Sequence, residues 1–99
     1  MLFATIYTPR GQVDEETSKR VQQIYGKWKP PAGMEIKAFY SLADGNGGIV
    51  ISEATTAAQI LEAISPFAPY MEYKVVPILE IGEAVSIGQR VNAWRDSVR

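Results

Sequence analysis

The chain has 99 residues, which is enough for a single domain over residues 1–99 with one modest core. Its content of 46% hydrophobic and 21% charged residues is typical of a globular protein. Cysteine and histidine are both absent, which excludes disulfide scaffolds, Cys/His zinc sites, thiol nucleophiles and catalytic triads with an imidazole base. Ten Lys and Arg residues against eleven Asp and Glu residues give a net charge of -1, so we expect no nucleic-acid partner.

The N-terminal residues indicate neither a signal peptide nor a membrane anchor. Residues 2–8 follow Met1 directly, with no basic stretch before them and no small-residue cleavage site after them. The longest apolar runs are far below the roughly 20 residues that cross a bilayer. We therefore expect a cytoplasmic protein without a membrane partner.

The first half of the chain alternates between strand and helix patterns. Aromatic and β-branched residues alternate over residues 2–8, which predicts a strand, and from Asp14 a helical spacing predicts a helix over about 14–28. Strands are predicted over about 34–42 and 48–53, with Ile36, Ala38 and Tyr40 of the first facing the core. The glycine-rich segment 44–48 joins them, which predicts a β-hairpin.

The second half repeats the pattern and adds a helix. Thr56 and Gln59 match a capping box, which predicts a helix over about 56–65. A strand over about 72–81 contains Pro77, which cannot donate a ladder hydrogen bond, so this strand is expected at an edge or with a bulge. A third helix over about 83–96 carries an apolar stripe made of Ala84, Ile87, Val91, Trp94 and Val98.

The predicted order is therefore βαββαβ followed by a helix. Two split βαβ units joined by a hairpin form an antiparallel four-stranded sheet with both crossover helices on one face, which is the ferredoxin-like α+β fold. The other face of the sheet stays open in such a fold.

Strict alternation assigns a largely apolar set of residues to the open face. The set is Phe3, Thr5, Tyr7, Lys37, Phe39, Ser41, Val50, Ser52, Lys74, Val76 and Ile78. An apolar patch of this size usually marks an interface or a ligand groove, so we predict a homodimer through the open sheet face. The alternative is that the C-terminal helix folds over this face, in its own subunit or in its partner.

Several short stretches carry a resemblance to a known family. They are WKPPAGMEIKAFY at residues 28–40, Ala43-Asp44-Gly45 with Gly47-Gly48, Ser65-Pro66-Phe67 and Val76-Pro77-Ile78. Through them the chain resembles DUF3303, a family of small bacterial proteins with no established function, from residue 2 to about residue 85. The family is similar to the dimeric α/β barrel group, which implies two ferredoxin-like subunits with their sheets packed together. That group includes cofactor-independent monooxygenases, isomerases, heme-handling proteins and ligand binders, so the resemblance implies a range of activities.

The candidate ligand-binding residues lie on the predicted open face and in the loop after the first strand. They are Tyr7, Lys37, Phe39, Ser52, Lys74 and Arg10. A lysine or arginine in a dimer cavity binds a carboxylate, and a nearby phenol donates a hydrogen bond. The structural alternative is that Lys37 and Lys74 extend to the rim and that Arg10 is an ordinary exposed loop residue. Segment 44–48 precedes a strand and lacks the phosphate-loop pattern, so a hairpin turn is the better interpretation.

Three functional hypotheses follow. The first is a pocket that binds a small apolar or aromatic molecule without catalysis. The second is a cofactor-independent enzyme of the isomerase or monooxygenase type, in which Tyr7 or Lys37 transfers a proton. The third is a structural or interaction domain whose sheet face is filled on dimerisation. Because the usual proton-transfer residues are scarce, we favour binding, and we expect neither a metal nor a cofactor.

Overall fold

The computed structural model describes residues 1–12 and 14–99. Its elements, in chain order, are β1 (Leu2–Pro9), α1 (Glu15–Lys27), β2 (Met34–Ser41), β3 (Gly48–Ala54), α2 (Ala57–Ile64), the 3-10 helix η1 (Ser65–Phe67), β4 (Met71–Ile78) and α3 (Ile81–Ser97). The predicted order of strands and helices is confirmed. The last strand is shorter than expected, because Ile81 begins α3 instead of ending β4.

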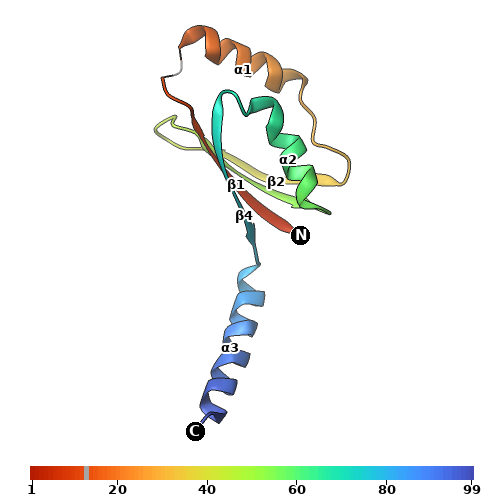
Figure 1. Ribbon diagram of the computed structural model, residues 1–99, viewed down its shortest axis with the longest axis vertical. Coiled ribbons are helices and arrows are strands. Elements are labelled where there is room, and N and C mark those ends of the chain that lie inside the picture. The colour runs from red at the N-terminus through yellow and green to blue at the C-terminus, as the bar shows by residue number, and fades with distance from the viewer. Residues whose placement is uncertain (13) are drawn as a thin grey trace.

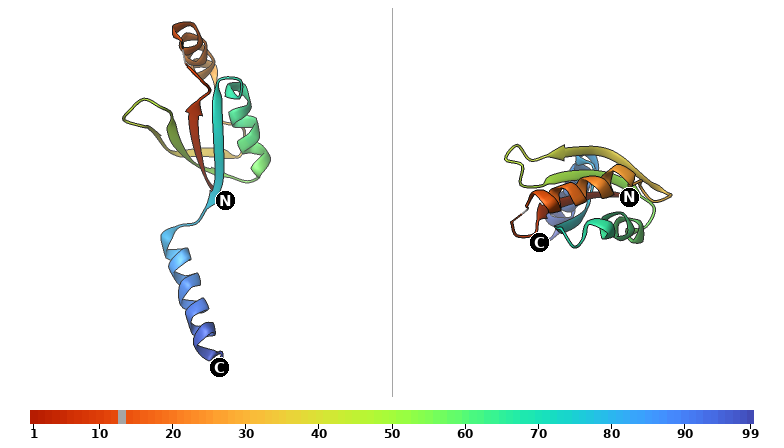
Figure 2. Two further views of the ribbon diagram at one scale, coloured as in Figure 1. Left: turned by 60° about the vertical axis from the view of Figure 1, so that its left-hand side comes forward. Right: turned by 90° about the horizontal axis from the view of Figure 1, so that it is seen from above.

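The four strands form one antiparallel sheet in the order β2-β3-β1-β4. Helices α1 and α2 both lie on one face of this sheet, as Figures 1 and 2 show. This is the α+β ferredoxin-like arrangement that the sequence predicted. Strand β4 lies at an edge of the sheet, and its residue Pro77 pairs with Phe3 of β1. Because β4 is an edge strand, the backbone N–H that proline lacks does not interrupt hydrogen bonding between two inner strands.

Local sequence signals explain where the helices and the hairpin begin. Asp14 caps α1, because its Oδ1 accepts a hydrogen bond from the backbone N–H of Thr17 at 2.7 Å. At the start of α2, Gln59 Oε1 accepts hydrogen bonds from the backbone N–H groups of Thr55 and Thr56 at 2.8 and 3.2 Å. The hairpin turns at Gly45 and Gly47, whose φ angles of 74° and 111° are accessible to glycine at little cost.

The core lies between the sheet and α2. Phe3 of β1, Ala54 of β3 and Ile60 of α2 are buried together, and Met34 packs against them. Phe3 therefore faces the helices, although strict alternation assigned it to the open face. Alternation shows which residues share a face, but it does not show which of the two faces the helices cover.

The predicted open-face set is thus partly wrong. The members on the face that the helices cover are Phe3, Thr5, Tyr7, Phe39, Ser41, Val50 and Ser52. The predictions for β4 are confirmed, because Lys74, Val76 and Ile78 lie opposite Ile6, Ala4 and Leu2 on the other face. The open face actually consists of Leu2, Ala4, Ile6, Thr8, Glu35, Ala38, Tyr40, Ile49, Ile51, Glu53, Glu72, Lys74, Val76 and Ile78.

A β-bulge in β2 explains the error in that strand. The register shifts between Ile36, which pairs with Ser52, and Ala38, which pairs with Ile51. The extra residue, Lys37, reverses the alternation for the rest of the strand. Ile36 faces the helices as predicted, whereas Ala38 and Tyr40 lie on the open face, and Phe39 turns toward the helices instead.

Helix α3 projects away from the rest of the molecule (Figures 1 and 2), so that the whole chain measures 63 × 30 × 19 Å. None of the residues 81–97, all of which the structure describes, is buried. Only Leu79 and Glu80 separate α3 from β4.

Candidate functional site

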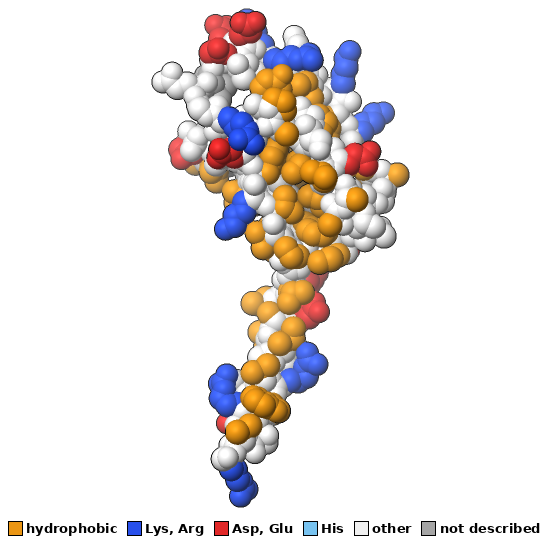
Figure 3. All heavy atoms as spheres, in the orientation of Figure 1, with side chains coloured by type: hydrophobic (Ala, Val, Ile, Leu, Met, Phe, Trp, Pro, Cys, Tyr) orange, Lys and Arg blue, Asp and Glu red, His pale blue; other side chains and the backbone are white. Residues whose placement is uncertain are grey.

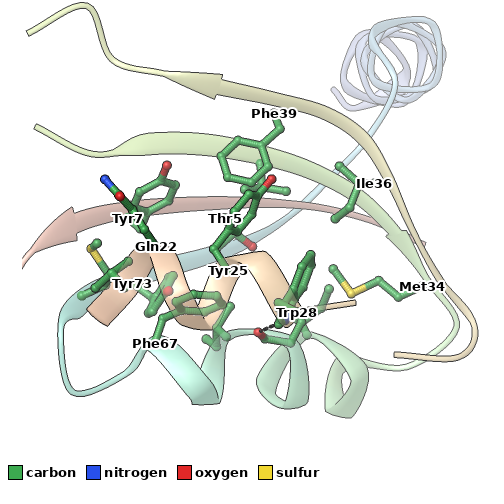
Figure 4. A pocket seen from close by; sticks show the side chains of 16 residues that line it. Thr5, Tyr7, Gln22, Tyr25, Trp28, Met34, Ile36, Phe39, Phe67 and Tyr73 are labelled. Carbon is green, nitrogen blue, oxygen red and sulfur yellow. Dashed lines mark hydrogen bonds between the residues drawn. The ribbon is translucent and has the colours of Figure 1, made fainter. Parts of the chain in front are cut away.

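A cavity of about 420 Å³ lies between the sheet and the two helices on its covered face. It is lined by Thr5, Tyr7, Val21, Gln22, Tyr25, Trp28, Met34, Ile36, Phe39, Val50, Ile60, Ala63, Ile64, Phe67, Met71 and Tyr73. Figure 4 shows the side chains of the strands pointing toward those of α1 and η1 across this space. Most of the lining is hydrophobic or aromatic, with a few hydroxyl and amide groups, which is the usual composition of a small-molecule pocket.

Six aromatic rings follow one another around the cavity wall. Tyr7 has its ring centroid 6.2 Å from that of Tyr73 and 6.1 Å from that of Phe39. Phe39 lies edge-on to Tyr25 at 6.1 Å, and Tyr25 stacks on Trp28 at 6.4 Å.

The last contact of this series joins Trp28 to Phe67 at 6.3 Å. The rings come from β1, β2, β4, α1, the residue after α1, and η1, so every layer of the domain contributes to the wall. We call these six residues the aromatic wall. Aromatic pairs at such distances add to the stability that comes from burying their surface.

Helix α1 covers the cavity without closing it. None of the residues Glu15–Lys27, all of them described, is buried, and Tyr25 remains 53% exposed although it lines the cavity. The C-terminal end of α1 is held by Trp28, whose indole Nε1 donates a hydrogen bond of 3.0 Å to the backbone oxygen of Ala63 in α2. The cavity therefore exists because α1 is anchored at this end and makes few contacts with the sheet along its length.

Two phenols of the aromatic wall have raised pKa values. Burial raises the pKa of Tyr73 to about 12, with a smaller effect of the neighbouring Tyr7. Burial also raises the pKa of Tyr7, assisted by Tyr25. Both phenols stay protonated at neutral pH, so each can donate a hydrogen bond into the cavity.

The candidate residues from the sequence do not form one site. Tyr7 and Phe39 line the cavity together. Ser52 lies on the same face of the sheet between Phe3 and Ile36, but it is fully buried and does not line the cavity. Its hydroxyl has no hydrogen-bond partner among the described residues.

The three basic candidates lie outside the cavity. Lys37 occupies the bulge of β2, where its Nζ is 3.3 Å from Oε2 of Glu35. Lys74 lies on the open face, on the other side of the sheet. Arg10 donates from its Nε to the backbone oxygen of Ala68 at 2.9 Å and is 3.6 Å from Glu72, so it holds the loop between η1 and β4.

Sequence reasoning missed four members of the aromatic wall. Tyr25 lies near the end of α1 and Trp28 directly follows it, whereas Phe67 ends η1 and Tyr73 lies within β4. The available signal was the number of large aromatic residues in a small domain. Their burial against one another requires the three-dimensional arrangement, because they are separated by up to 66 positions in the sequence.

Taken together, these features define a ferredoxin-like α+β domain with an aromatic cavity on the covered face of its sheet. The chain belongs to the family described as "Domain of unknown function (DUF3303)", whose model matches residues 1–92. The resemblance to DUF3303 noted from its motifs is thereby confirmed.

One curated protein is similar over part of the chain. A stretch of 63 residues, 64% of this chain, is 35% identical to a type III effector AvrE of Pseudomonas syringae pv. tomato (strain ATCC BAA-871 / DC3000). The stretch covers 3% of that effector, so the chain spans a very small part of the curated relative that it matches.

Among the helices that the structure describes, none has the length and hydrophobicity needed to cross a membrane.

Proposed function

We propose that this protein binds a small, flat, apolar or aromatic molecule in the cavity under α1. The observation that carries the proposal is the aromatic wall, which lines a cavity of about 420 Å³ and presents ring faces and edges from six residues. A volume of this size fits the range of ligand pockets in proteins.

The polar groups of the cavity support binding of a neutral or weakly polar ligand. Tyr7 and Tyr73 offer protonated hydroxyl groups, and Thr5 and Gln22 add a hydroxyl and an amide. The lining contains no lysine, arginine, aspartate or glutamate among the described residues. A ligand with one or two hydrogen-bond acceptors on an aromatic ring therefore suits this cavity better than an anion or a cation does.

The same groups favour binding over acid-base catalysis. A general base has to be deprotonated near neutral pH, and the raised pKa values of Tyr7 and Tyr73 keep both phenols protonated. Lys37, the other residue considered for proton transfer, is paired with Glu35 outside the cavity.

Titration with the neutral, aromatic fluorescent dye N-phenyl-1-naphthylamine tests the proposal. The variant Val21→Phe introduces a larger side chain into the cavity from α1, where no residue of the helix is buried and the fold tolerates the change. We expect the affinity for the dye to fall about tenfold, which corresponds to about 1.4 kcal/mol.

The matched control is Gln23→Phe, which adds the same ring to an exposed residue of α1 outside the cavity lining. We expect this variant to bind the dye as the unmodified protein does. Equal binding by Val21→Phe and the unmodified chain would place the dye elsewhere and overturn the proposal. Native mass spectrometry of the purified protein then identifies any molecule that occupies the cavity.

A further inference from the structure

Two apolar surfaces of this molecule lack a partner, and both lie away from the cavity. One is the centre of the open face, where aliphatic residues of β1 and β3 are covered by no described element. The other is α3, along which Figure 3 shows hydrophobic side chains on the exposed surface. Val91 and Trp94 of α3 are 44% and 68% exposed.

A projecting helix with an exposed apolar stripe is not stable by itself. A helix of 17 residues is marginal in water unless an amphipathic face is packed against something. The only side-chain hydrogen bonds of α3 among the described residues are local, from Arg95 to Asn92 and from Ser97 to the backbone of Trp94. The helix therefore requires a contact that the isolated chain does not supply.

The connection to β4 directs α3 away from its own sheet. Only Leu79 and Glu80 intervene, and Glu80 has an extended backbone with φ −65° and ψ 145°. Helix α3 consequently continues beyond the end of the sheet instead of reversing over the open face (Figure 2). A second copy of the chain, in contrast, can receive the projecting helix.

We propose that two copies of this chain exchange their α3 helices, so that the apolar stripe of each α3 packs on the open face of the other copy. A twofold arrangement covers both unpartnered surfaces of both copies at once. The charges are compatible with it, because Arg90 and Arg95 flank the stripe together with Glu83, while the open face carries Glu35, Glu53 and Glu72 against a single lysine, Lys74.

The size of the contact is sufficient for a specific dimer. A helix of this length is about 25 Å long and about 10 Å wide. Two exchanged helices, with both surfaces counted, bury about 1,000 Å², which reaches the lower limit for a biological interface.

Cross-linking between single-cysteine variants tests the exchange, because the chain has no cysteine of its own. Ala4→Cys marks the centre of the open face and Val91→Cys marks the stripe of α3. The two variants, one of them isotopically labelled, are mixed, refolded together and treated with a short bismaleimide. We expect a cross-link between one Ala4→Cys chain and one Val91→Cys chain.

Two results would overturn the proposal. The first is an internal cross-link in a chain that carries both substitutions and is diluted into an excess of unmodified chains, because this cross-link forms only if α3 folds over its own sheet. The second is a dimer that forms no cross-link between these two positions, because such a dimer is held together by other surfaces. Exchange predicts neither result.

A pair of substitutions in α3 provides an independent readout by analytical ultracentrifugation. Trp94→Asp places a charge in the stripe, and we expect it to weaken dimerisation at least tenfold. Val85 precedes Trp94 by nine residues and lies on the opposite side of the helix, so Val85→Asp leaves the dimer intact. Equal effects of the two substitutions would contradict docking through the stripe. Both residues lie outside the cavity lining, so dye binding stays unchanged and reports on the proposed function separately.

Discussion

The ring of Tyr7 occupies the space where Gly48 has no side chain. An ideal Cβ on Gly48 would lie 2.5 Å from the phenol oxygen of Tyr7 and 2.7 Å from its Cζ, and it would also lie 2.6 Å from the backbone oxygen of Tyr40. The two residues are paired across β1 and β3. A residue of the hairpin thus determines the position of one of the rings that line the cavity.

The variant Gly48→Ala is expected to displace Tyr7 and to destabilise the domain. Neither the strand backbone nor the ring can move without disturbing its neighbours, so we expect a loss of about 1–3 kcal/mol in the free energy of unfolding. Urea denaturation measures it. The control Gly26→Ala meets no atom within 4 Å in the last turn of α1 and is expected to stabilise by up to about 0.5 kcal/mol. Equal effects of the two substitutions would show that Tyr7 does not depend on Gly48.

The variant Ser52→Ala is expected to stabilise the protein. Its hydroxyl is fully buried and has no hydrogen-bond partner among the described residues, so the native state pays a desolvation penalty that alanine removes. We expect the free energy of unfolding to rise by about 1 kcal/mol in urea denaturation. Ser41→Ala is the control, because Ser41 is exposed, and a change near zero is expected there. A clear loss of stability in Ser52→Ala would reveal a partner for this hydroxyl.

Stability is expected to fall at alkaline pH because of Tyr73. Its pKa is raised from 10.0 to about 12 in the folded state, so between these values the unfolded chain releases its proton first. The contribution is fully present below pH 10 and is lost as the pH rises toward 12. Thermal unfolding across this range should show a shallower decline in Tyr73→Phe. Tyr40→Phe, at a residue that is 68% exposed, should retain the decline of the unmodified protein.

The hydrogen bond from Trp28 to Ala63 is expected to limit local unfolding of α1. The variant Trp28→Phe keeps an aromatic ring but removes the indole donor, so the anchored end of α1 loses its link to α2. We expect amide hydrogen exchange in α1 to become about fivefold faster, which corresponds to about 1 kcal/mol. Exchange in β1 and β3 should change less. Trp94→Phe on α3 is the control, and an equal effect there would exclude a specific role for the bond.

The sequence allowed the fold to be predicted because each element carries its own local signal. Asp14, the pair Thr56 and Gln59, and the glycines of segment 44–48 marked the ends of helices and the hairpin, and the structure places helix starts and a turn at these positions. Pro77 likewise indicated an edge strand, which β4 is. Such signals act within a few residues and can be recognised without knowledge of the tertiary structure.

The site was harder to predict because it depends on which face the helices cover. Residues 3, 5 and 7 share a face by alternation alone, but only the packing of Ile60 against Phe3 shows that this face is the covered one. The bulge at Lys37 left no recognisable mark in the alternating pattern of β2, and it moved Phe39 into the cavity. The candidates Tyr7 and Phe39 therefore lie together, but on the side of the sheet opposite to the one expected.

The alternation of side chains along β1 and β3 has a consequence for how this family can diverge. Thr5 and Val50 line the cavity, while their neighbours Ile6 and Ile51 belong to the open face. Along each strand, one set of positions thus faces the cavity and the alternating set lies on the open face. No residue belongs to both sets. Mutations that alter what the cavity accepts need not disturb what the outer surface contacts, so natural selection can act on the two properties separately.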